Sequence, residues 1–342
     1  MGSHDLSRRT FIKYGIAAAG TIALGLEGEL LPKPASPSQI TTNDTFTTTP
    51  FNATSHQGVR PTRVDAHGHT VPGLSADRVV SLMDKAGISH MVLMARGRSD
   101  SLTAEIYKQY PQRILPFVSS MYPAWHRQDE RVLSYAEKQL STGIFMGVGE
   151  VMLRYYGIPS KNEPEINVPA DSSFMKKLSD IVENYNAVML VHMEPEAEAI
   201  RSLENLLNYN KKLRLIWAHC GTVARVGLKA IGHSDIAALM DRHPNLYTDI
   251  AGVQPMSVAP SGGLRRPPIT DDSGKLLPEF KEILEKHSDR VLFGLDTPYE
   301  ECWAEEPFTQ WVKWGDSVVG QIEDSKVAER IMHENAENLF NI

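Results

Sequence analysis

The sequence predicts a single (β/α)8 barrel, and three observations support this prediction. From residue 63 onward, eight strand-like segments alternate with helix-like segments over about 280 residues, which matches the length and order of eight βα units. Several strand-like segments are continuous apolar runs, such as VMLV, LIWA and VLF, as expected for parallel strands buried on both faces. The first strand–helix turn lacks a G-x-G-x-x-G pattern, which weakens the main alternative, a doubly wound open sheet that binds a dinucleotide.

The strand-like segments follow one another at intervals that leave room for a helix between them. In chain order they are RVDAHGH (63–69), HMVLMA (90–95), RILPFVSSM (113–121), GIFMGVGEV (143–151), AVMLVHM (187–193), LRLIWAHC (213–220), NLYTDIAG (245–252) and RVLFGLDTP (290–298). In the first helix-like segment, Val79, Val80, Met83 and Ile88 recur at the spacing of one helix face. The helix-like segments are 75–88, 101–111, 129–142, 172–186, 196–211, 235–244, 277–289 and 325–340. An insert rich in Pro and Asn interrupts the alternation at about residues 155–171.

The composition is that of a globular protein with a large core, because 42% of the 342 residues are hydrophobic and 23% are charged. This length would also allow two domains, but an α/β barrel of this size is one domain. A formal net charge of −7, without a dense run of Lys and Arg, argues against a nucleic-acid or anionic-membrane partner. Cys220 and Cys302 are the only cysteines, so no disulfide framework holds the fold.

The first 30 residues are predicted to be an export signal. SRRTFIK (7–13) precedes the 12-residue apolar stretch GIAAAGTIALGL (15–26), which is too short to span a bilayer. Arg8 and Arg9, followed by Phe11 and Lys13, resemble a twin-arginine signal, which implies transport of a folded protein to the bacterial periplasm. A basic N-terminal helix is the alternative. No clear A-x-A cleavage site follows, so an uncleaved membrane anchor also stays open.

The segment after this signal is predicted to be a linker. Residues 31–61 are rich in Pro, Ser and Thr, a composition typical of a mostly unstructured spacer. The predicted organisation is therefore a signal at 1–30, a linker at 31–61 and the barrel at 62–342.

Six ionisable residues fall where the predicted strands end. They are His67 and His69 on the first strand, Glu150 on the fourth, His192 on the fifth, His219 on the sixth and Asp296 on the eighth. Active sites of such barrels form at the carboxyl ends of the strands. We therefore expect four imidazoles and two carboxylates to meet at one end of the barrel.

This set of side chains predicts a divalent metal site. Residues i and i+2 of a strand point the same way, so His67 and His69 can bind one ion. Imidazole and carboxylate ligands suit Zn²⁺, Fe²⁺, Mn²⁺ or Co²⁺, with Zn²⁺ the default. Burial of six such groups without a cation would be costly. A divalent ion also lowers the pKa of a bound water to about 7, which makes hydroxide available near neutral pH.

Each residue taken alone has a plainer interpretation. A His-x-His pair can be two polar positions near a turn, His192 or His219 can be a hydrogen-bonded core histidine, Glu150 can cap a segment or pair with Arg154, and Asp296 can be a turn residue. The occurrence of all six at strand ends favours the metal site over these separate interpretations.

Two neighbours of the ligand candidates are expected to have other roles. Asp65 shares a face with His67 and His69 but lies deeper in the barrel, so it is expected to support the ligands rather than to bind the ion. Cys220 follows His219 and is expected to be a buried free thiol. A disulfide between Cys220 and Cys302 is the alternative in an oxidising compartment.

The residues quoted above resemble the amidohydrolase superfamily of metal-dependent hydrolases over residues 63–342. The order His-x-His, Glu, His, His, Asp is similar to the full ligand set of that superfamily. VLFGLDTPYE (291–300) and HENAENLF (333–340) resemble the final strand and C-terminal helix of the amidohydrolase 2 branch, which includes decarboxylases, hydratases and lactonases. GVGEVMLRYY (147–156) resembles the strand-4 motif of TatD-type hydrolases, in which the Glu bridges two metals.

The resemblance implies a role for each ligand candidate. A first ion would be held by His67, His69 and Asp296. A second would be held by His192 and His219, with Glu150 shared between the two. Asp296 would also accept the proton of the attacking water.

The amidohydrolase 2 pattern implies a different arrangement with one ion. His192 would then be the third imidazole ligand, and His219 would polarise the substrate. The fourth strand offers no Lys for carbamylation, so Glu150 is the bridging candidate and favours two ions.

The main functional hypothesis is hydrolysis of a carbonyl or phosphoryl bond of a small molecule by metal-activated water. The insert with Tyr155 and Tyr156 and the loop GGLRRPP (262–268) are expected to form the substrate walls. Arg265 or Arg266 would bind an anionic group or be solvated. One rival is a decarboxylase or other lyase with one metal ion, and another is a non-catalytic exported binding protein. A small-molecule substrate and, transiently, the export machinery are the expected partners; no nucleic acid is expected, and a homo-oligomer stays open.

Overall fold

The computed structural model describes residues 63–96, 99–119, 123–157, 164–221, 233–254, 269–271 and 273–342. These residues belong to one structural unit of the chain, Gln57–Ile342. The predicted signal (1–30), the linker (31–61) and the loop GGLRRPP (262–268) lie outside the described residues.

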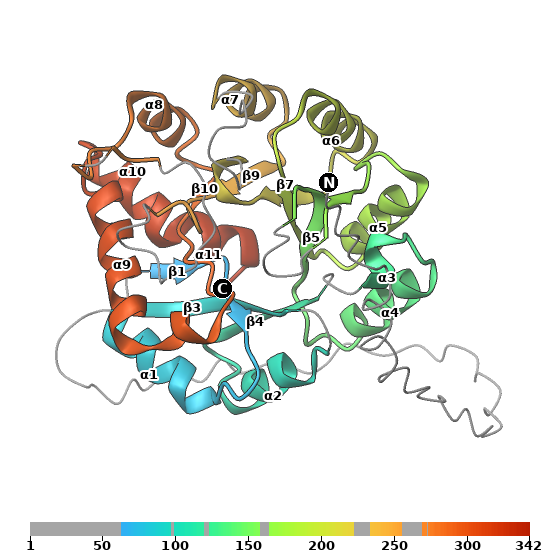
Figure 1. Cartoon of the computed structure of the whole chain (residues 1–342), viewed down its shortest axis with the longest axis horizontal. Coiled ribbons are helices and arrows are strands. Elements are labelled where there is room, and N and C mark those ends of the chain that lie inside the picture. The colour runs from blue at the N-terminus through green and yellow to red at the C-terminus, as the bar shows by residue number, and fades with distance from the viewer. Residues whose placement is uncertain are drawn as a thin grey trace, which may run out of the picture. The chain divides into compact units, whose positions relative to one another are not determined.

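Eight parallel strands form the predicted (β/α)8 barrel (Figure 1). In order around the barrel they are β1 (Arg63–Asp65), β3 (Ile88–Ala95), β4 (Ile114–Val118), β5 (Gly147–Tyr155), β7 (Val188–Met193), β8 (Arg214–Trp217), β9 (Leu246–Asp249) and β10 (Val291–Leu292). Backbone hydrogen bonds connect the two ends of this series: Ala66 N–H donates to Phe293 O (2.9 Å), and Asp296 N–H donates to His67 O (2.7 Å). The barrel is therefore nearly closed, and the predicted fold class is confirmed.

Helices surround the strands in Figure 1. They are α1 (Ala76–Ala86), α2 (Ser101–Gln109), α3 (Pro123–His126), α4 (Arg131–Leu140), α5 (Ser173–Asn184), α6 (Ala197–Tyr209), α7 (His233–Arg242), α8 (Pro278–Lys286), α9 (Glu305–Val319), α10 (Ser325–Glu329) and, after a π-helical turn (Arg330–Glu334), α11 (Asn335–Phe340). Helix α1 begins where Ser75 Oγ accepts the Arg78 N–H (3.2 Å), and it ends at Gly87, whose φ of 63° favours glycine. Its buried Val79, Val80 and Met83 confirm three residues of the predicted apolar face, but the fourth, Ile88, is the first residue of β3 because the helix ends at Ala86.

The amino end of the barrel is closed by α11. Leu339 and Phe340 belong to the same buried cluster as the residues inside the barrel. The ring of Phe340 meets that of Phe117 in β4 edge-on, with 5.9 Å between the ring centres. Arg214, the first residue of β8, donates to the carbonyl of Leu339 (2.6 Å). Because Arg214 begins its strand, α11 lies at the end of the barrel opposite the predicted metal site.

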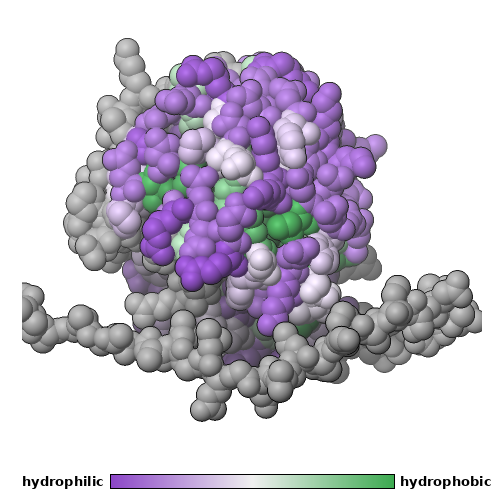
Figure 2. Space-filling model, turned by 90° about the vertical axis from the view of Figure 1, so that its right-hand side faces the viewer, coloured by the Kyte–Doolittle hydropathy of each residue, from purple (hydrophilic) through white to green (hydrophobic). Residues whose placement is uncertain are grey.

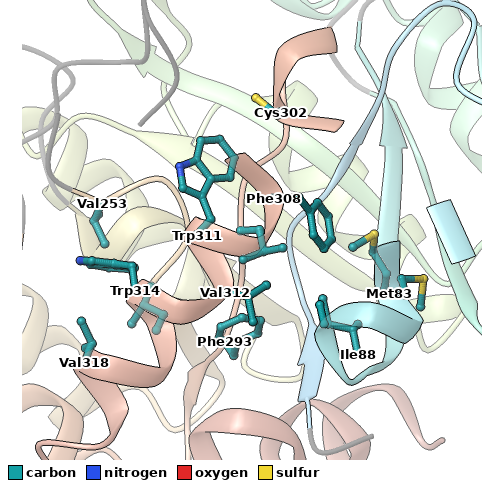
Figure 3. Packing of buried hydrophobic residues seen from close by; sticks show 14 of the residues in the cluster. Met83, Ile88, Val253, Phe293, Cys302, Phe308, Trp311, Val312, Trp314 and Val318 are labelled. Atoms are coloured by element: carbon teal, nitrogen blue, oxygen red, sulfur yellow. The ribbon is translucent and has the colours of Figure 1, made fainter. Parts of the chain in front are cut away.

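Outside the barrel, α9 packs against α1 and against the segment that follows β10. Figure 3 shows Phe308, Trp311 and Val312 of α9 beside Phe293, which follows β10, and Met83 of α1. Each of these side chains is at most 5% exposed. Burial of such large side chains dominates core energetics, so this cluster holds the C-terminal helices against the first βα unit.

Strand β5 begins and ends later than predicted. The expected segment was 143–151, but the strand runs Gly147–Tyr155, so Glu150 lies within it rather than at its end. Its last two residues pair antiparallel with β6 (Ile166–Asn167), which belongs to the predicted insert. This pairing provides hydrogen-bond partners for the backbone groups of these last two residues of β5. The Pro- and Asn-rich composition of the insert gave no sign of it.

The two cysteines are buried and free, which confirms the predicted free thiol and excludes the alternative disulfide. Cys220 Sγ donates to the carbonyl of Asp249 (3.2 Å). Burial raises the pKa of the Cys302 thiol to about 12 and also raises that of Cys220. Both side chains are therefore neutral thiols near neutral pH.

The outer helices present a mostly hydrophilic surface on the face shown in Figure 2, where hydrophobic residues appear mainly in recesses. Tyr185, Tyr209 and Ile342 are the exposed large hydrophobic residues of the described part of the chain. Among the described helices, none combines the length and the apolar character that a membrane crossing requires.

Candidate metal centre

The six predicted ligand residues lie together at the carboxyl end of the barrel. His67 follows β1, His69 begins β2 (His69–Thr70), Glu150 lies in β5, His192 lies in β7, His219 begins the 3-10 turn after β8, and Asp296 follows β10. All six are buried, and the most exposed of them, Glu150, has 5% of its surface accessible. The structure thus collects four imidazoles and two carboxylates from strands far apart in the sequence.

Special backbone positions bring these residues together. A Cβ on Gly68 would lie 2.7 Å from the carbonyl oxygen of Val92, so only glycine lets the turn between His67 and His69 approach β3 this closely. His219 and Asp296 both have left-handed backbones, with φ of 67° and 61°. His and Asp adopt that conformation more often than most other residues, and such positions cluster at functional sites.

His67, His69 and Asp296 form one compact group, whose ligand atoms lie within 4.8 Å of one another. Asp296 Oδ1 is 3.4 Å from His69 Nε2 and 3.8 Å from His67 Nε2. The buried Nε2 of His67 has no hydrogen-bond partner among the residues that the structure describes. Two ligand atoms each about 2.1 Å from a tetrahedral ion lie about 3.4 Å apart. The group therefore fits a divalent cation better than it fits a set of direct hydrogen bonds.

Glu150 faces two pairs of imidazoles with its two oxygens. Oε2 lies 3.5 Å from His69 Nε2 and 3.9 Å from His67 Nε2. Oε1 lies 3.0 Å from His192 Nδ1 and 3.1 Å from His219 Nε2. One carboxylate is thus positioned between two sets of nitrogen ligands.

The second set of imidazoles has defined orientations. His219 Nδ1 is 2.9 Å from the carbonyl of Ala251, which can only accept, so Nδ1 carries a proton and neutral His219 turns the lone pair of Nε2 toward Glu150. His192 Nε2 is 3.3 Å from Glu194 Oε1, and its Nδ1 is 3.2 Å from His219 Nε2. His219 and Glu150, with His67, also form a second group of ligand atoms within 4.8 Å. This second group shares His67 with the first and does not include His192.

The charges of the cluster are strongly coupled. Burial acts to raise the pKa of Glu150, but hydrogen bonds with His192 and His219 outweigh it and hold the pKa well below its usual range. Burial acts to lower the pKa of His67, but Asp249 and Glu150 outweigh it and raise the pKa well above 6.5. Burial also acts to lower the pKa of His192, but hydrogen bonds with Glu150 and Glu194 outweigh it and raise the pKa to about 9. The ionised carboxylates therefore demand positive charge, which is supplied by protons or by a metal ion.

Sequence reasoning missed two buried acids that contact the predicted ligands. Asp249, the last residue of β9, places Oδ2 3.0 Å from His67 Nδ1. Glu194 directly follows β7 and contacts His192. Both are fully buried. Glu194 directly follows a predicted strand, a position that would have identified it, whereas Asp249 lies inside the predicted segment 245–252 and is a strand end only in the structure.

Asp65 lies behind the site, in the supporting position expected for it. Its Oδ1 accepts the backbone N–H groups of His67 and Leu295, both at 3.0 Å. Burial raises its pKa to about 7. These contacts connect the segments after β1 and β10, which carry three of the six candidate ligands.

The start of the insert lies close to the second set of imidazoles. The Tyr155 ring meets His192 edge-on, with 5.4 Å between the ring centres. Arg154 forms a two-point ion pair with Glu196 (2.9 Å for each contact) and a further pair with Glu165 (2.7 Å). These pairs hold the end of β5 against the loop after β7. The proposed partnership of Arg154 with Glu150 is thus replaced by contacts with two other glutamates.

Comparison with known proteins gives one family and a set of similar folds. A family model described as Amidohydrolase (Amidohydro_2) matches residues 53–342. A search of curated proteins found no match.

Three solved structures illustrate the similar folds. A TatD homologue from Escherichia coli K12 is 13% identical, with a TM-score of 0.55 over 82% of this chain and 99% of its own. 4-Oxalomesaconate hydratase from Rhodopseudomonas palustris is 12% identical, with a TM-score of 0.52 over 82% and 95%. L-Hydantoinase (dihydropyrimidinase) from Arthrobacter aurescens is 13% identical, with a TM-score of 0.53 over 82% and 71%. At these identities the similarity shows a common barrel fold.

Proposed function

Because this chain belongs to the amidohydrolase family, we propose that it is a metal-dependent hydrolase acting on a carbonyl or phosphoryl bond of a small molecule. One observation carries the proposal: Glu150 directs Oε2 toward His67 and His69 and Oε1 toward His192 and His219. A carboxylate between two sets of nitrogen ligands is suited to bridging two cations, as the TatD-like motif implies.

The proposed ligand sets are those that the resemblance implies, and these contacts support them. One ion would be held by His67, His69 and Asp296, and the other by His192 and His219, with Glu150 shared. We propose Zn²⁺, because imidazole and carboxylate ligands suit it. When bound, a divalent ion polarises the substrate and lowers the pKa of a water ligand to about 7.

The chain itself supplies proton transfer and orientation. The Asp296 carboxylate lies beside both His67 and His69, where it would accept a proton from the attacking water and return it to the leaving group. His219 donates its Nδ1–H to Ala251 and so has a lone pair at Nε2 in its neutral form. That orientation supports a ligand role for His219 over polarisation of the substrate by hydrogen bonding.

The second candidate is a decarboxylase or other lyase with one metal ion. It is favoured by the compactness of His67, His69 and Asp296, which alone provide three ligands. One of the similar structures is that of a hydratase. A metal content near one ion per chain, together with carbon dioxide release from an aromatic or unsaturated acid, would support the lyase. A non-catalytic binding protein would show no activity on esters, lactones, amides or phosphoesters.

Elemental analysis of the purified protein tests the hydrolase proposal. We expect about two ions per chain in the wild type, almost none in His67→Ala and half the wild-type content in Glu150→Ala. Unchanged metal in Glu150→Ala would instead support the one-ion site. A wild type without metal would overturn both candidates.

We also propose that the chain is exported by the twin-arginine pathway, on the strength of Arg8 and Arg9 ahead of the apolar stretch. In the full-length protein, an Arg8→Lys/Arg9→Lys double variant should stay in the cytoplasm while the wild type reaches the periplasm. Equal periplasmic amounts of the two proteins, measured by cell fractionation, would contradict this assignment.

A further inference from the structure

We propose that Asp249 is a positioning residue that determines which nitrogen of His67 can bind a metal ion, while also holding the backbone of His219. The inference rests on the proposed metal-dependent function. One buried carboxylate would thus orient His67, a ligand of the first proposed ion site, and His219, a ligand of the second.

The first contact concerns the protonation of His67. Asp249 is fully buried, and its Oδ2 lies 3.0 Å from His67 Nδ1. An ionised carboxylate only accepts hydrogen bonds, so Nδ1 must carry the proton of this pair. The lone pair of neutral His67 is then on Nε2, the nitrogen 3.8 Å from Asp296 Oδ1 and 3.9 Å from Glu150 Oε2. Asp249 therefore directs the ligand atom toward the two carboxylates that would share the ion.

The second contact concerns the backbone. Asp249 Oδ1 accepts the N–H of His219 (2.7 Å) and the N–H of Ala251 (3.1 Å). His219 has a left-handed backbone, so its position depends on such local hydrogen bonds. The carbonyl of Ala251 in turn accepts Nδ1–H of the His219 ring. The segment 249–251 thus holds His219 at both its backbone and its ring.

Asparagine at position 249 separates these two contacts. An amide oxygen can still accept from the two backbone N–H groups, but the NH₂ group would then face His67 Nδ1 and donate to it. His67 would have to accept at Nδ1 and carry its proton on Nε2, where it cannot bind a metal. The opposite amide orientation would direct NH₂ at two backbone donors, which is unfavourable. Asp249→Asn is therefore expected to keep the fold and to invert the His67 tautomer.

Zinc binding and tautomer state test the proposal together. Full-length wild type, Asp249→Asn and Asp100→Asn are compared by equilibrium dialysis with Zn²⁺. Asp100 is a matched control, because it is also a buried acid but accepts from the Ser119 N–H and the Tyr135 hydroxyl rather than from an imidazole. Supporting contacts to ligand imidazoles typically change metal affinity by about 10- to 100-fold. We expect a loss at the upper end, about 100-fold, in Asp249→Asn and wild-type affinity in Asp100→Asn.

The second measurement is a series of long-range ¹H–¹⁵N spectra of the metal-free, histidine-labelled proteins, recorded at rising pH until the His67 imidazole is neutral. The wild type should show His67 protonated at Nδ1, and Asp249→Asn should show it protonated at Nε2. Wild-type zinc affinity in Asp249→Asn, or a wild-type His67 protonated at Nε2, would overturn the inference. The wild-type spectrum decides the matter even where the variant does not fold. A wild type that binds no zinc would overturn the proposed function. The positioning role would still hold if His67 is protonated at Nδ1 in the wild type and at Nε2 in Asp249→Asn.

Discussion

The two ends of the barrel are built from opposite kinds of side chain. At the amino end, Leu339 and Phe340 close the interior against Phe117, and Arg214 donates to a backbone carbonyl. At the carboxyl end, five carboxylates are buried beside four imidazoles; they are Asp65, Glu150, Glu194, Asp249 and Asp296. Buried ionised groups are unfavourable unless an opposite charge compensates them. The amino end is therefore apolar and needs no added charge, whereas the carboxylates of the carboxyl end require positive charge from protonated imidazoles or from a metal ion.

Phe340→Ala should break the amino end alone. Truncation of a buried Phe costs about 3–5 kcal/mol of unfolding free energy, and Phe340 is 3% exposed. We expect a loss of this size in urea denaturation with the zinc content per chain unchanged. Ile342→Ala is the control, because Ile342 is 42% exposed and should change the free energy little. Loss of zinc in a folded Phe340→Ala protein would show that the two ends are coupled.

Removal of the metal should break the carboxyl end alone. An ion that binds only the folded state adds about 2.7 kcal/mol of stability at a free concentration 100 times its dissociation constant. A chelator should therefore lower the melting temperature of the wild type, measured by calorimetry. His67→Ala should melt at the same temperature with or without chelator. A wild type insensitive to chelation would contradict the contrast between the two ends.

The pH dependence of zinc binding sharpens the contrast. The pKa of His192 is raised to about 9 in the metal-free protein, so below that pH the imidazole must lose a proton before it binds an ion. Over the range below pH 9, where His192 is protonated, zinc affinity should therefore rise with pH by about tenfold per unit per proton released, or about 1.4 kcal/mol. Calorimetric titration in two buffers of different ionisation enthalpy measures the protons released. No proton release at pH 7 would exclude His192 as a ligand.

Substitutions on the exposed surface of the outer helices should change the unfolding free energy least. Lys85 of α1 and Glu305 of α9 form an ion pair (2.6 Å), but their side chains are 50% and 57% exposed. Exposed pairs contribute about 0.2–1 kcal/mol. Lys85→Ala should therefore lower the unfolding free energy far less than Phe340→Ala does and leave zinc content unchanged. A loss comparable to that of Phe340→Ala would show that α1 and α9 depend on this pair rather than on their buried aromatic contacts.

The barrel and the convergence of the six candidate ligands follow from local pattern. Strand order places His67, His192 and Asp296 at one end once the alternation of strands and helices is recognised. The length of β5 was not predictable, because its last residues depend on pairing with the distant β6. The contacts of Asp249 and Glu194 were also missed. Each depends on which imidazole nitrogen faces which carboxylate, a relation set by packing across the barrel and not by neighbours in the sequence.

The placement of α11 has a consequence for the order in which the molecule is assembled. All eight barrel strands leave the ribosome before residues 335–340. The amino end of the barrel therefore stays uncovered until Phe340 has emerged. Partial chains expose apolar surface that promotes aggregation, so the nascent strands would need shielding during this interval. The packing of Phe340 against Phe117 is therefore the last contact of the barrel interior to become available during synthesis.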